Sequence, residues 1–230
     1  MTSPPRVLIT GGGRGIGRAI ALRFAREGAM VTVAARSSDQ LDAVAKEIDQ
    51  AGGKGLAANM NVADHGSVEA AVWRAVQFMD NGIDLLINNA GVFQVAPIDK
   101  VKPSDWNFVI ETNLTGPYLV TFESLDYLTE SERPQIINIA SAAAKQGFAG
   151  NTAYCASKFG LRGFSDALRE DLREDGVRVT TVYPPATDTT IFDNVDGEWD
   201  RSTMKQPEEI AEAVYNAWIS EEPIDEVDFS

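Results

Sequence analysis

Short apolar runs alternate along the chain with segments whose apolar residues recur every three or four positions. The first run covers residues 6–10, stops at consecutive glycines, and leads into a helical pattern. The same alternation continues to the end of the sequence. We expect strands at 6–10, 31–35, 55–59, 83–87, 134–140, 177–183 and 224–229, and helices at 16–27, 39–50, 68–79, 152–174 and 208–218, with a further long helix after Pro103.

This alternation determines the expected fold class. Strands joined by helices form parallel sheets, and strands that are almost wholly apolar fit a sheet covered on both faces. The sequence therefore predicts an α/β fold, a single Rossmann-type doubly wound parallel sheet of about seven strands with helices on both faces. No linker or low-complexity segment interrupts the pattern. We expect one domain over residues 1–230, with a polar lid at about 186–206 that follows the Pro184-Pro185 break.

Composition and charge narrow the classes of partner. The chain has 230 residues, of which 44% are hydrophobic and 23% charged, as in ordinary globular domains. Acidic residues number 34 against 20 basic ones, and the net charge of −14 repels phosphate backbones and anionic lipid headgroups. We therefore expect neither a nucleic-acid nor a membrane partner. Without a signal-like start or a long apolar span, a cytoplasmic location is expected.

Cysteine and histidine are almost absent. Cys155 is the only cysteine, so no internal disulfide can form. His65 is the only histidine, so histidine and cysteine together cannot supply the ligands of a typical zinc site. We expect no metal.

A glycine-rich turn lies between the first predicted strand and the first predicted helix. Residues 10–17 read Thr-Gly-Gly-Gly-Arg-Gly-Ile-Gly, and glycines there let a phosphate approach both the backbone and the positive end of a helix dipole. The spacing differs from the common G-x-G-x-x-G fingerprint, so a turn that only packs helix on strand is the alternative. We expect a dinucleotide to bind at Gly11, Arg14, Gly15, Ile16 and Gly17.

The residues at the end of the second predicted strand indicate which dinucleotide the protein binds. NAD sites usually carry an acid there, which binds the ribose 2′-hydroxyl, whereas residues 34–37 read Ala-Ala-Arg-Ser. Arginine pairs with a 2′-phosphate that a carboxylate would repel. Asp39, the nearest acid, fits a helix cap, and a solvated surface arginine is the alternative for Arg36. Arg36 and Ser37, together with Arg14, predict NADP(H) and disfavour NAD(H).

Tyr154 and Lys158 lie four residues apart, so a helix places them on one face, one turn apart. A phenol titrates near pH 10 and exchanges protons poorly at neutral pH unless a cation stabilises its phenolate. Lys158 can be that cation. Ser141 ends the fifth predicted strand, at the sheet edge where ligands bind, and its hydroxyl can hold a carbonyl oxygen. An exposed tyrosine–lysine pair without a catalytic role is the alternative.

Four separated motifs together resemble the short-chain dehydrogenase/reductase family over nearly the whole chain, including its 3-oxoacyl reductase-like members. The motifs are the glycine turn at 10–17, Asn88-Asn89-Ala90-Gly91, Asn113 in the intervening helix, and the set Ser141, Tyr154 and Lys158. Their order and spacing agree with the family pattern. The resemblance implies an NADP(H)-dependent oxidoreductase that interconverts a small-molecule carbonyl and a secondary alcohol.

The resemblance also implies catalytic roles. NADPH would deliver a hydride to the carbonyl carbon while Tyr154 donates the proton and Ser141 bonds the carbonyl oxygen. Lys158 would lower the pKa of Tyr154 and bind the nicotinamide ribose. Asn113 would hold a water in a proton relay to Lys158. Alcohol oxidation is the same path reversed.

Further cofactor contacts follow from the resemblance alone. Asn61 and Val62 would border the adenine, and Asn61 stands where the family usually has Asp. The remaining contacts would come from Asn88, Ala90, Gly91, Pro184, Thr187 and Thr189. The family has Pro-Gly after the sixth strand, whereas this chain has Pro184-Pro185, and proline removes an N–H and fixes φ. The cofactor loop therefore departs from the family pattern at Pro185.

Charge and aromatic residues give partial information on the substrate. The predicted lid carries the acids Asp188, Asp193, Asp196, Glu198 and Asp200 against Arg201 and Lys205. Such a loop would not attract an acidic carrier protein, which weakens a 3-oxoacyl carrier-protein reductase assignment. Apolar substrate walls and core packing fit equally for Phe93, Phe148, Phe192 and Trp199. The sequence does not select the substrate.

Other functions stay open. Loss of Ser141, Tyr154 or Lys158 would favour a catalytically silent NADP-binding sensor, but all three residues are present. A structural Rossmann module with a groove blocked by Pro185 is another alternative. Epimerase or dehydratase relatives typically have a larger C-terminal substrate domain. The resemblance further implies a homodimer or homotetramer, paired through the helices that contain Asn113 and Tyr154.

Overall fold

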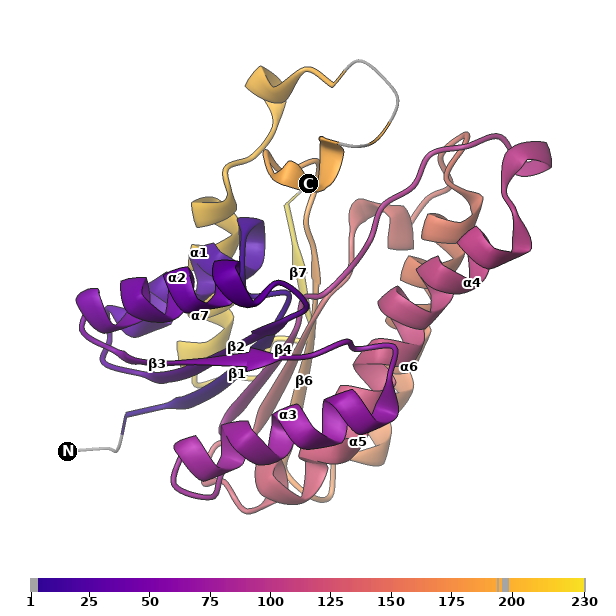
Figure 1. The fold of residues 1–230 in the computed structure, drawn as a ribbon. Coiled ribbons are helices and arrows are strands. Elements are labelled where there is room, and N and C mark those ends of the chain that lie inside the picture. Colours follow the sequence, from indigo (N-terminus) through magenta and orange to yellow (C-terminus); the bar gives the residue numbers. More distant parts are fainter. Residues whose placement is uncertain (1–3, 194, 196–198, 230) are drawn as a thin grey trace.

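The computed structural model describes residues 4–193, 195 and 199–229, and its centre is one parallel sheet (Figure 1). The strand order is β3-β2-β1-β4-β5-β6-β7, and every neighbouring pair is parallel. The strands are β1 (Arg6–Thr10), β2 (Met30–Ala35), β3 (Lys54–Asn59), β4 (Leu85–Asn88), β5 (Gln135–Ile139), β6 (Arg178–Tyr183) and β7 (Glu226–Asp228). The predicted doubly wound α/β fold is confirmed.

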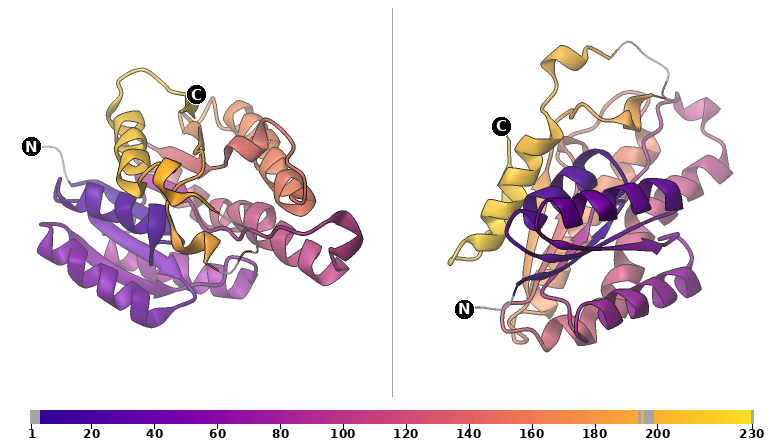
Figure 2. Two further views of the ribbon diagram at one scale, coloured as in Figure 1. Left: turned by 90° about the horizontal axis from the view of Figure 1, so that it is seen from above. Right: turned by 60° about the vertical axis from the view of Figure 1, so that its left-hand side comes forward.

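Helices cover both faces of this sheet. The α-helices are α1 (Gly15–Ala25), α2 (Ser38–Gln50), α3 (His65–Phe78), α4 (Pro103–Ile110), α5 (Gly116–Thr129), α6 (Thr152–Asp171) and α7 (Pro207–Ile219). Helices α1, α2 and α7 cover one face, and α3, α5 and α6 cover the other (Figure 1). The views of Figure 2 show α7 beside α1, which it contacts along its length.

The two cores follow from the strand pattern. In β1, Val7 and Ile9 join the core under α1, α2 and α7, whereas Leu8 joins the core under α3 and α5. Successive side chains of a strand point to opposite faces, so an unbroken apolar run supplies both cores at once. All three side chains are fully buried. The apolar strands in the sequence are therefore explained by a sheet without a solvent-exposed face.

Three local features differ from the sequence expectation. The long helix after Pro103 contains a π-helical turn, η2 (Glu111–Thr115), between α4 and α5. Asp39 does not cap α2, because Ser37 occupies the cap position and Asp39 lies in the first turn, where a carboxylate still favours the helix dipole. Helix α6 ends at Asp171, a few residues earlier than predicted.

The segment predicted as a lid contains regular structure in its described part. Two short 3₁₀ helices, η4 (Thr190–Phe192) and η5 (Arg201–Thr203), lie within it. A bridge joins Thr187 to Lys205, so the two ends of the segment lie together. Asp196 and Glu198 are outside the described residues.

The sheet topology sets the position of a site. The chain reverses its direction of winding between β1 and β4, and ligands bind outside the carboxyl ends of parallel strands at such a point. The glycine turn and Ser141 follow strand ends at this edge, and Asn88 is the last residue of β4. No helix in the described part of the chain is long and apolar enough to cross a membrane.

Candidate active site

A cavity of about 600 Å³ lies along the carboxyl edge of the sheet. One end is formed by the glycine turn after β1 and by the end of β2, and the other by the segment after β5 and the start of α6. Most of the expected site residues line it: Gly11, Arg14, Gly15, Ile16, Arg36, Ser37, Asn61, Val62, Ala90, Gly91, Ser141, Tyr154, Lys158, Pro184, Thr187 and Thr189. Segments far apart in the sequence thus meet at one cavity.

The backbone of the glycine turn fits a bound phosphate. Gly11 and Gly15 have φ of +66° and +54°, in the left-handed region that favours glycine. A Cβ on Gly17 would lie 2.4 Å from the Gly11 carbonyl oxygen, so this position requires glycine for packing. Arg14 precedes α1 without a side-chain cap, which leaves N–H groups of the first helical turn free for an anion.

The charges on the cavity wall have one sign. Its charged residues are Arg14, Arg36 and Lys158, and among the residues that the structure describes no Asp or Glu lines it. Arg14 and Arg36 are exposed and form no ion pair within the described ranges, although the Arg36 guanidinium lies 5.9 Å from the centre of the Phe108 ring. On a protein with a net charge of −14, this cavity is a local basic site suited to a phosphorylated ligand.

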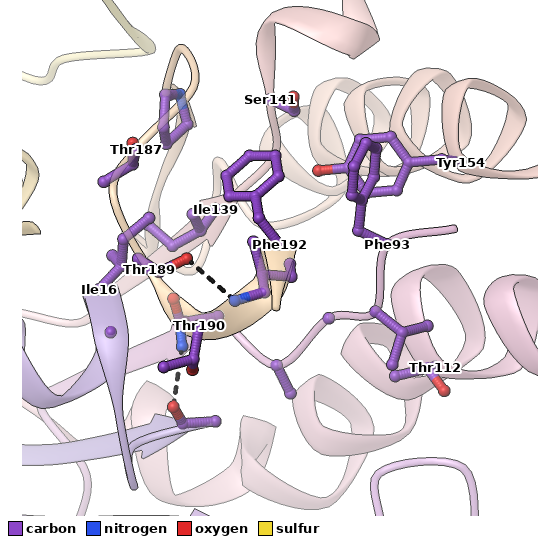
Figure 3. A pocket seen from close by; sticks show the side chains of 18 of the residues that line it. Ile16, Phe93, Thr112, Ile139, Ser141, Tyr154, Thr187, Thr189, Thr190 and Phe192 are labelled. Atoms are coloured by element: carbon purple, nitrogen blue, oxygen red, sulfur yellow. Dashed lines mark hydrogen bonds between the residues drawn. The ribbon is translucent and has the colours of Figure 1, made fainter. Parts of the chain in front are cut away.

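Tyr154 and Ser141 meet at the opposite end of the cavity (Figure 3). Tyr154 lies in the first turn of α6, and Ser141 follows β5. Burial raises the pKa of the Tyr154 phenol, and a hydrogen bond with the Ser141 hydroxyl opposes that rise. The phenol is therefore protonated at neutral pH, the form that can donate a proton.

Lys158 lies one turn further along α6 and is 5% exposed. Its Nζ donates a hydrogen bond to the Ile139 carbonyl oxygen at 2.9 Å and lies 5.8 Å from the centre of the Tyr154 ring. Burial lowers the pKa of Lys158 to about 8, so the ammonium is charged at neutral pH. The resemblance implied that Lys158 lowers the pKa of Tyr154, but in this structure burial outweighs any such effect and the pKa of Tyr154 is raised.

Asn113 lies behind the cavity wall rather than on it. Its Nδ2 donates to the Val92 carbonyl oxygen at 2.9 Å and to Ser157 Oγ at 3.1 Å, and its Oδ1 accepts from the Val92 N–H at 2.8 Å. The π-helical turn η2 holds this side chain, and such turns often occur at functional sites. A Cβ on Gly91 would lie 3.4 Å from Asn113 Oδ1 and 3.8 Å from Lys158 Nζ, so both groups flank the same backbone.

The Asn88 side chain, which was expected to line the groove, is not on the cavity wall. The Asn88 side chain is 2% exposed and donates to Thr121 and Asn138 in the core below the cavity. Asn89 lines the cavity instead, and its Nδ2 donates to the Thr10 and Gly11 carbonyl oxygens. Adjacent residues at a strand end point in opposite directions, and that alternation was the signal that could have separated Asn88 from Asn89.

Gly17 also lies off the wall, because it packs behind the turn against Gly11. Further residues that were not predicted as site residues contribute to the wall. Gly13 and Asn89 belong to motifs already recognised in the sequence, whereas Gln40, Met60, Thr112, Asn151 and Ile191 belong to no motif that spacing alone reveals.

The segment after β6 closes over the glycine turn despite its second proline. The Pro184 carbonyl oxygen accepts from the Ala142 N–H at 3.1 Å, and the Pro185 carbonyl oxygen accepts from the Thr187 hydroxyl at 2.9 Å. A Cβ on Gly15 would lie 3.1 Å from the Thr189 methyl group, so Thr189 packs directly against the turn. Pro185 itself lines the cavity.

Comparison with known proteins agrees with this arrangement. The sequence profile of the short chain dehydrogenase family matches residues 5–199. The 3-oxoacyl-[acyl-carrier-protein] reductase of Synechocystis sp. is 36% identical over 210 residues, which cover 89% of this chain and 85% of that protein. The chain therefore belongs to the short chain dehydrogenase family and is an oxidoreductase.

Solved structures show the same fold. A metagenomic short-chain oxidoreductase in complex with NADP has a TM-score of 0.84 and 32% identity, covering 98% of this chain and 97% of that chain. A 3-ketoacyl-(acyl-carrier-protein) reductase from Brucella melitensis, complexed with NADH, has a TM-score of 0.88 and 26% identity, covering 97% and 95%. The similarity thus extends beyond the nucleotide-binding strands to the whole chain.

Proposed function

We propose that this protein is an NADP(H)-dependent oxidoreductase that interconverts a carbonyl compound and a secondary alcohol. The observation that carries the proposal is the placement of Tyr154, Ser141 and Lys158 on the same cavity as an arginine-lined glycine turn. Such a cavity can hold a phosphorylated dinucleotide at one end and a reacting carbonyl at the other. Family membership supports the carbonyl and alcohol chemistry.

The protonation and position of Tyr154, Ser141 and Lys158 determine their roles in the reaction. NADPH, when bound, supplies the hydride that adds to the carbonyl carbon. Ser141 bonds the carbonyl oxygen, and Tyr154, protonated at neutral pH, donates its proton to that oxygen as negative charge develops. The Lys158 ammonium, 5.8 Å from the Tyr154 ring, stabilises the phenolate that remains. The carbonyl is reduced to an alcohol and NADPH is oxidised to NADP⁺.

The choice of NADP(H) rests on the second strand end. Arg36 and Arg14 are exposed on the cavity wall and leave their guanidinium groups open to a 2′-phosphate. No described carboxylate lines the wall to bind a free 2′-hydroxyl. The NADP complex of the metagenomic relative supports this choice, whereas the NADH complex of the Brucella relative makes the comparison of cofactors a necessary test.

The test is a fluorescence titration of the purified protein with NADPH and with NADH, followed by turnover of a panel of ketones and aldehydes. We expect NADPH to bind more tightly by about 10-fold or more, since charge-assisted hydrogen bonds contribute about 1.5–3 kcal/mol. A carbonyl compound should then be reduced.

Two results would contradict this proposal in different ways. Tight cofactor binding without turnover of any carbonyl compound would favour the catalytically silent sensor. Failure to bind either nucleotide would make Pro185 the first residue to examine, because it lines the cavity where the family has glycine.

The remaining expectations form part of the same proposal. The chain acts as one domain with residues 186–206 as a substrate lid, in the cytoplasm, on a small-molecule substrate. It pairs as a homodimer or homotetramer through α4, α5 and α6, whose large exposed apolar side chains are Phe108, Tyr118, Phe122 and Phe159. Sedimentation equilibrium would test the pairing, and a monomer at micromolar concentration would contradict it.

A further inference from the structure

We propose that the substrate is an uncharged ketone that carries an aromatic ring, or the corresponding secondary alcohol. The inference rests on the proposed function and specifies its substrate class. It depends on a group of residues that we call the aromatic wall, namely Phe93, Phe148, Phe192 and Trp199, all of which line the cavity.

The aromatic wall is assembled at Tyr154 from separate parts of the chain. Phe93 follows β4, Phe148 precedes α6, and Phe192 and Trp199 come from the segment after β6. The Phe93 ring lies edge-on to Tyr154, with 4.8 Å between centroids, and Figure 3 shows Phe192 facing the same space. The sequence alone left core packing open for these residues, and the structure places them on the cavity.

Phe93, Phe192 and Trp199 of the wall contact one another as well. Phe93 lies edge-on to Phe192 at 5.6 Å and to Trp199 at 5.8 Å, and Phe192 and Trp199 are 4.8 Å apart. Ring edges and faces carry opposite partial charges, so a further ring that enters the cluster finds complementary edges and faces. Such contacts contribute about 0.5–1.5 kcal/mol beyond the burial of area. They favour an aromatic substituent over a saturated one of equal size.

Among the described residues, the aromatic end of the cavity offers no free cation to an ionised substrate. Arg14 precedes α1 and Arg36 follows β2, at the other end of the cavity, and Lys158 is buried with its Nζ donating to the Ile139 carbonyl oxygen. No other described residue on the cavity wall carries a charge, so a substrate carboxylate would find no free cation beside the aromatic wall. An unpaired ion in such a site costs several kcal/mol.

The described acids of the lid segment add no charge to the cavity wall. Asp188 and Asp193 both pair with Arg201, and Asp200 caps η5 by accepting from the Ser202 N–H. Within the described residues, none of these acids lines the cavity. The lid segment therefore directs Phe192 and Trp199 to the cavity, while Asp188, Asp193 and Asp200 have their partners outside it.

The first experiment compares three ketones of one skeleton, with NADPH as reductant. Methyl benzoylformate is neutral and aromatic, benzoylformate is the corresponding carboxylate anion, and methyl 2-cyclohexyl-2-oxoacetate is neutral and carries a saturated ring. We expect kcat/KM for the aromatic ester to exceed that of the anion by about 100-fold or more, from the cost of an unpaired carboxylate. It should exceed that of the cyclohexyl ester by about 2- to 10-fold, from the lost ring contacts.

The second experiment changes the wall. Trp199→Leu should remove most of the preference for the aromatic over the cyclohexyl ester, mainly through KM, while NADPH binding is retained as evidence of folding. Trp73→Leu is the matched control, because Trp73 is exposed on α3 away from the cavity. Phe148→Lys, at a position 45% exposed, should raise kcat/KM for benzoylformate relative to its ester.

The outcomes separate this inference from the proposed function. Equal or faster reduction of benzoylformate, or of the cyclohexyl ester, would overturn the inference while leaving an NADP(H)-dependent reductase. An unchanged preference in Trp199→Leu would also overturn it. Binding of NADPH without reduction of any ketone would instead contradict the proposed function itself.

Discussion

The cavity wall near β1 and β2 is formed largely by backbone and by arginines, whereas the wall beside Tyr154 is formed by aromatic side chains. At the first end, positive φ at Gly11 and Gly15 and the uncapped start of α1 create the shape and the charge. At the second end, rings from three loops create an uncharged surface. Backbone groups and arginines suit a phosphorylated cofactor that many enzymes share. Aromatic side chains, which substitution can exchange without changing the backbone, suit a particular substrate.

The largest effect is expected from Tyr154→Phe at the aromatic end. Loss of the proton donor should lower kcat by about 10²–10⁴-fold, the usual contribution of general acid catalysis. The Kd for NADPH should change by less than about 2-fold, since the phosphate-binding end is untouched. Tyr118→Phe, at an exposed tyrosine of α5, is the control. A kcat that survives in Tyr154→Phe would remove this residue from the mechanism.

The next prediction concerns the pH dependence of protein stability that Lys158 causes. The pKa of Lys158 is about 8 in the native state, against 10.5 as its ordinary value, so the unfolded chain binds more protons between these pH values. Stability from this residue therefore rises as pH increases from 8 to 10.5. The full gain is about 3 kcal/mol.

Urea denaturation of the native chain and of Lys158→Met would measure this term. The difference in free energy of unfolding should shift in favour of the native chain over that pH interval. A constant difference would mean that Lys158 keeps its ordinary pKa in the folded protein.

A third prediction concerns the backbone of the phosphate-binding end. A Cβ on Gly17 would lie 2.4 Å from a carbonyl oxygen, so Gly17→Ala should cost about 1–3 kcal/mol of stability and weaken NADPH binding. Gly163→Ala is the contrasting variant, because nothing lies within 4 Å of its Cβ in α6. That change should stabilise the protein by up to about 1 kcal/mol. Thermal unfolding of both variants is the measurement, and equal effects would show that the turn tolerates side chains.

The smallest effect is expected from Arg36→Gln. Because Arg36 is exposed, we expect its loss to raise the Kd for NADPH by about 10-fold, or 1.4 kcal/mol, and to leave the Kd for NADH unchanged. Arg26→Gln removes another exposed arginine that does not line the cavity. Parallel weakening of both cofactors would assign Arg36 to general charge attraction instead of to the 2′-phosphate.

Local patterns in the sequence predicted most of the fold and of the candidate site. The central strands carry enough apolar residues to fill both cores, and the glycine turn, Ser141 and the start of α6 with Tyr154 and Lys158 meet at one edge of the parallel sheet. The π-helical turn around Asn113 was not predicted, because it is held by hydrogen bonds from Asn113 to Val92 and Ser157, which lie far away in the sequence.

The sequence by itself determined the alternation of strands and helices, the glycines of the turn and the types of side chain that can carry proton transfer. Tertiary structure alone decided that burial raises the pKa of Tyr154 and that Phe93 contacts Phe192. These outcomes depend on contacts between residues far apart in the chain and on the exclusion of water. Neither is encoded in the spacing of residues within any one segment.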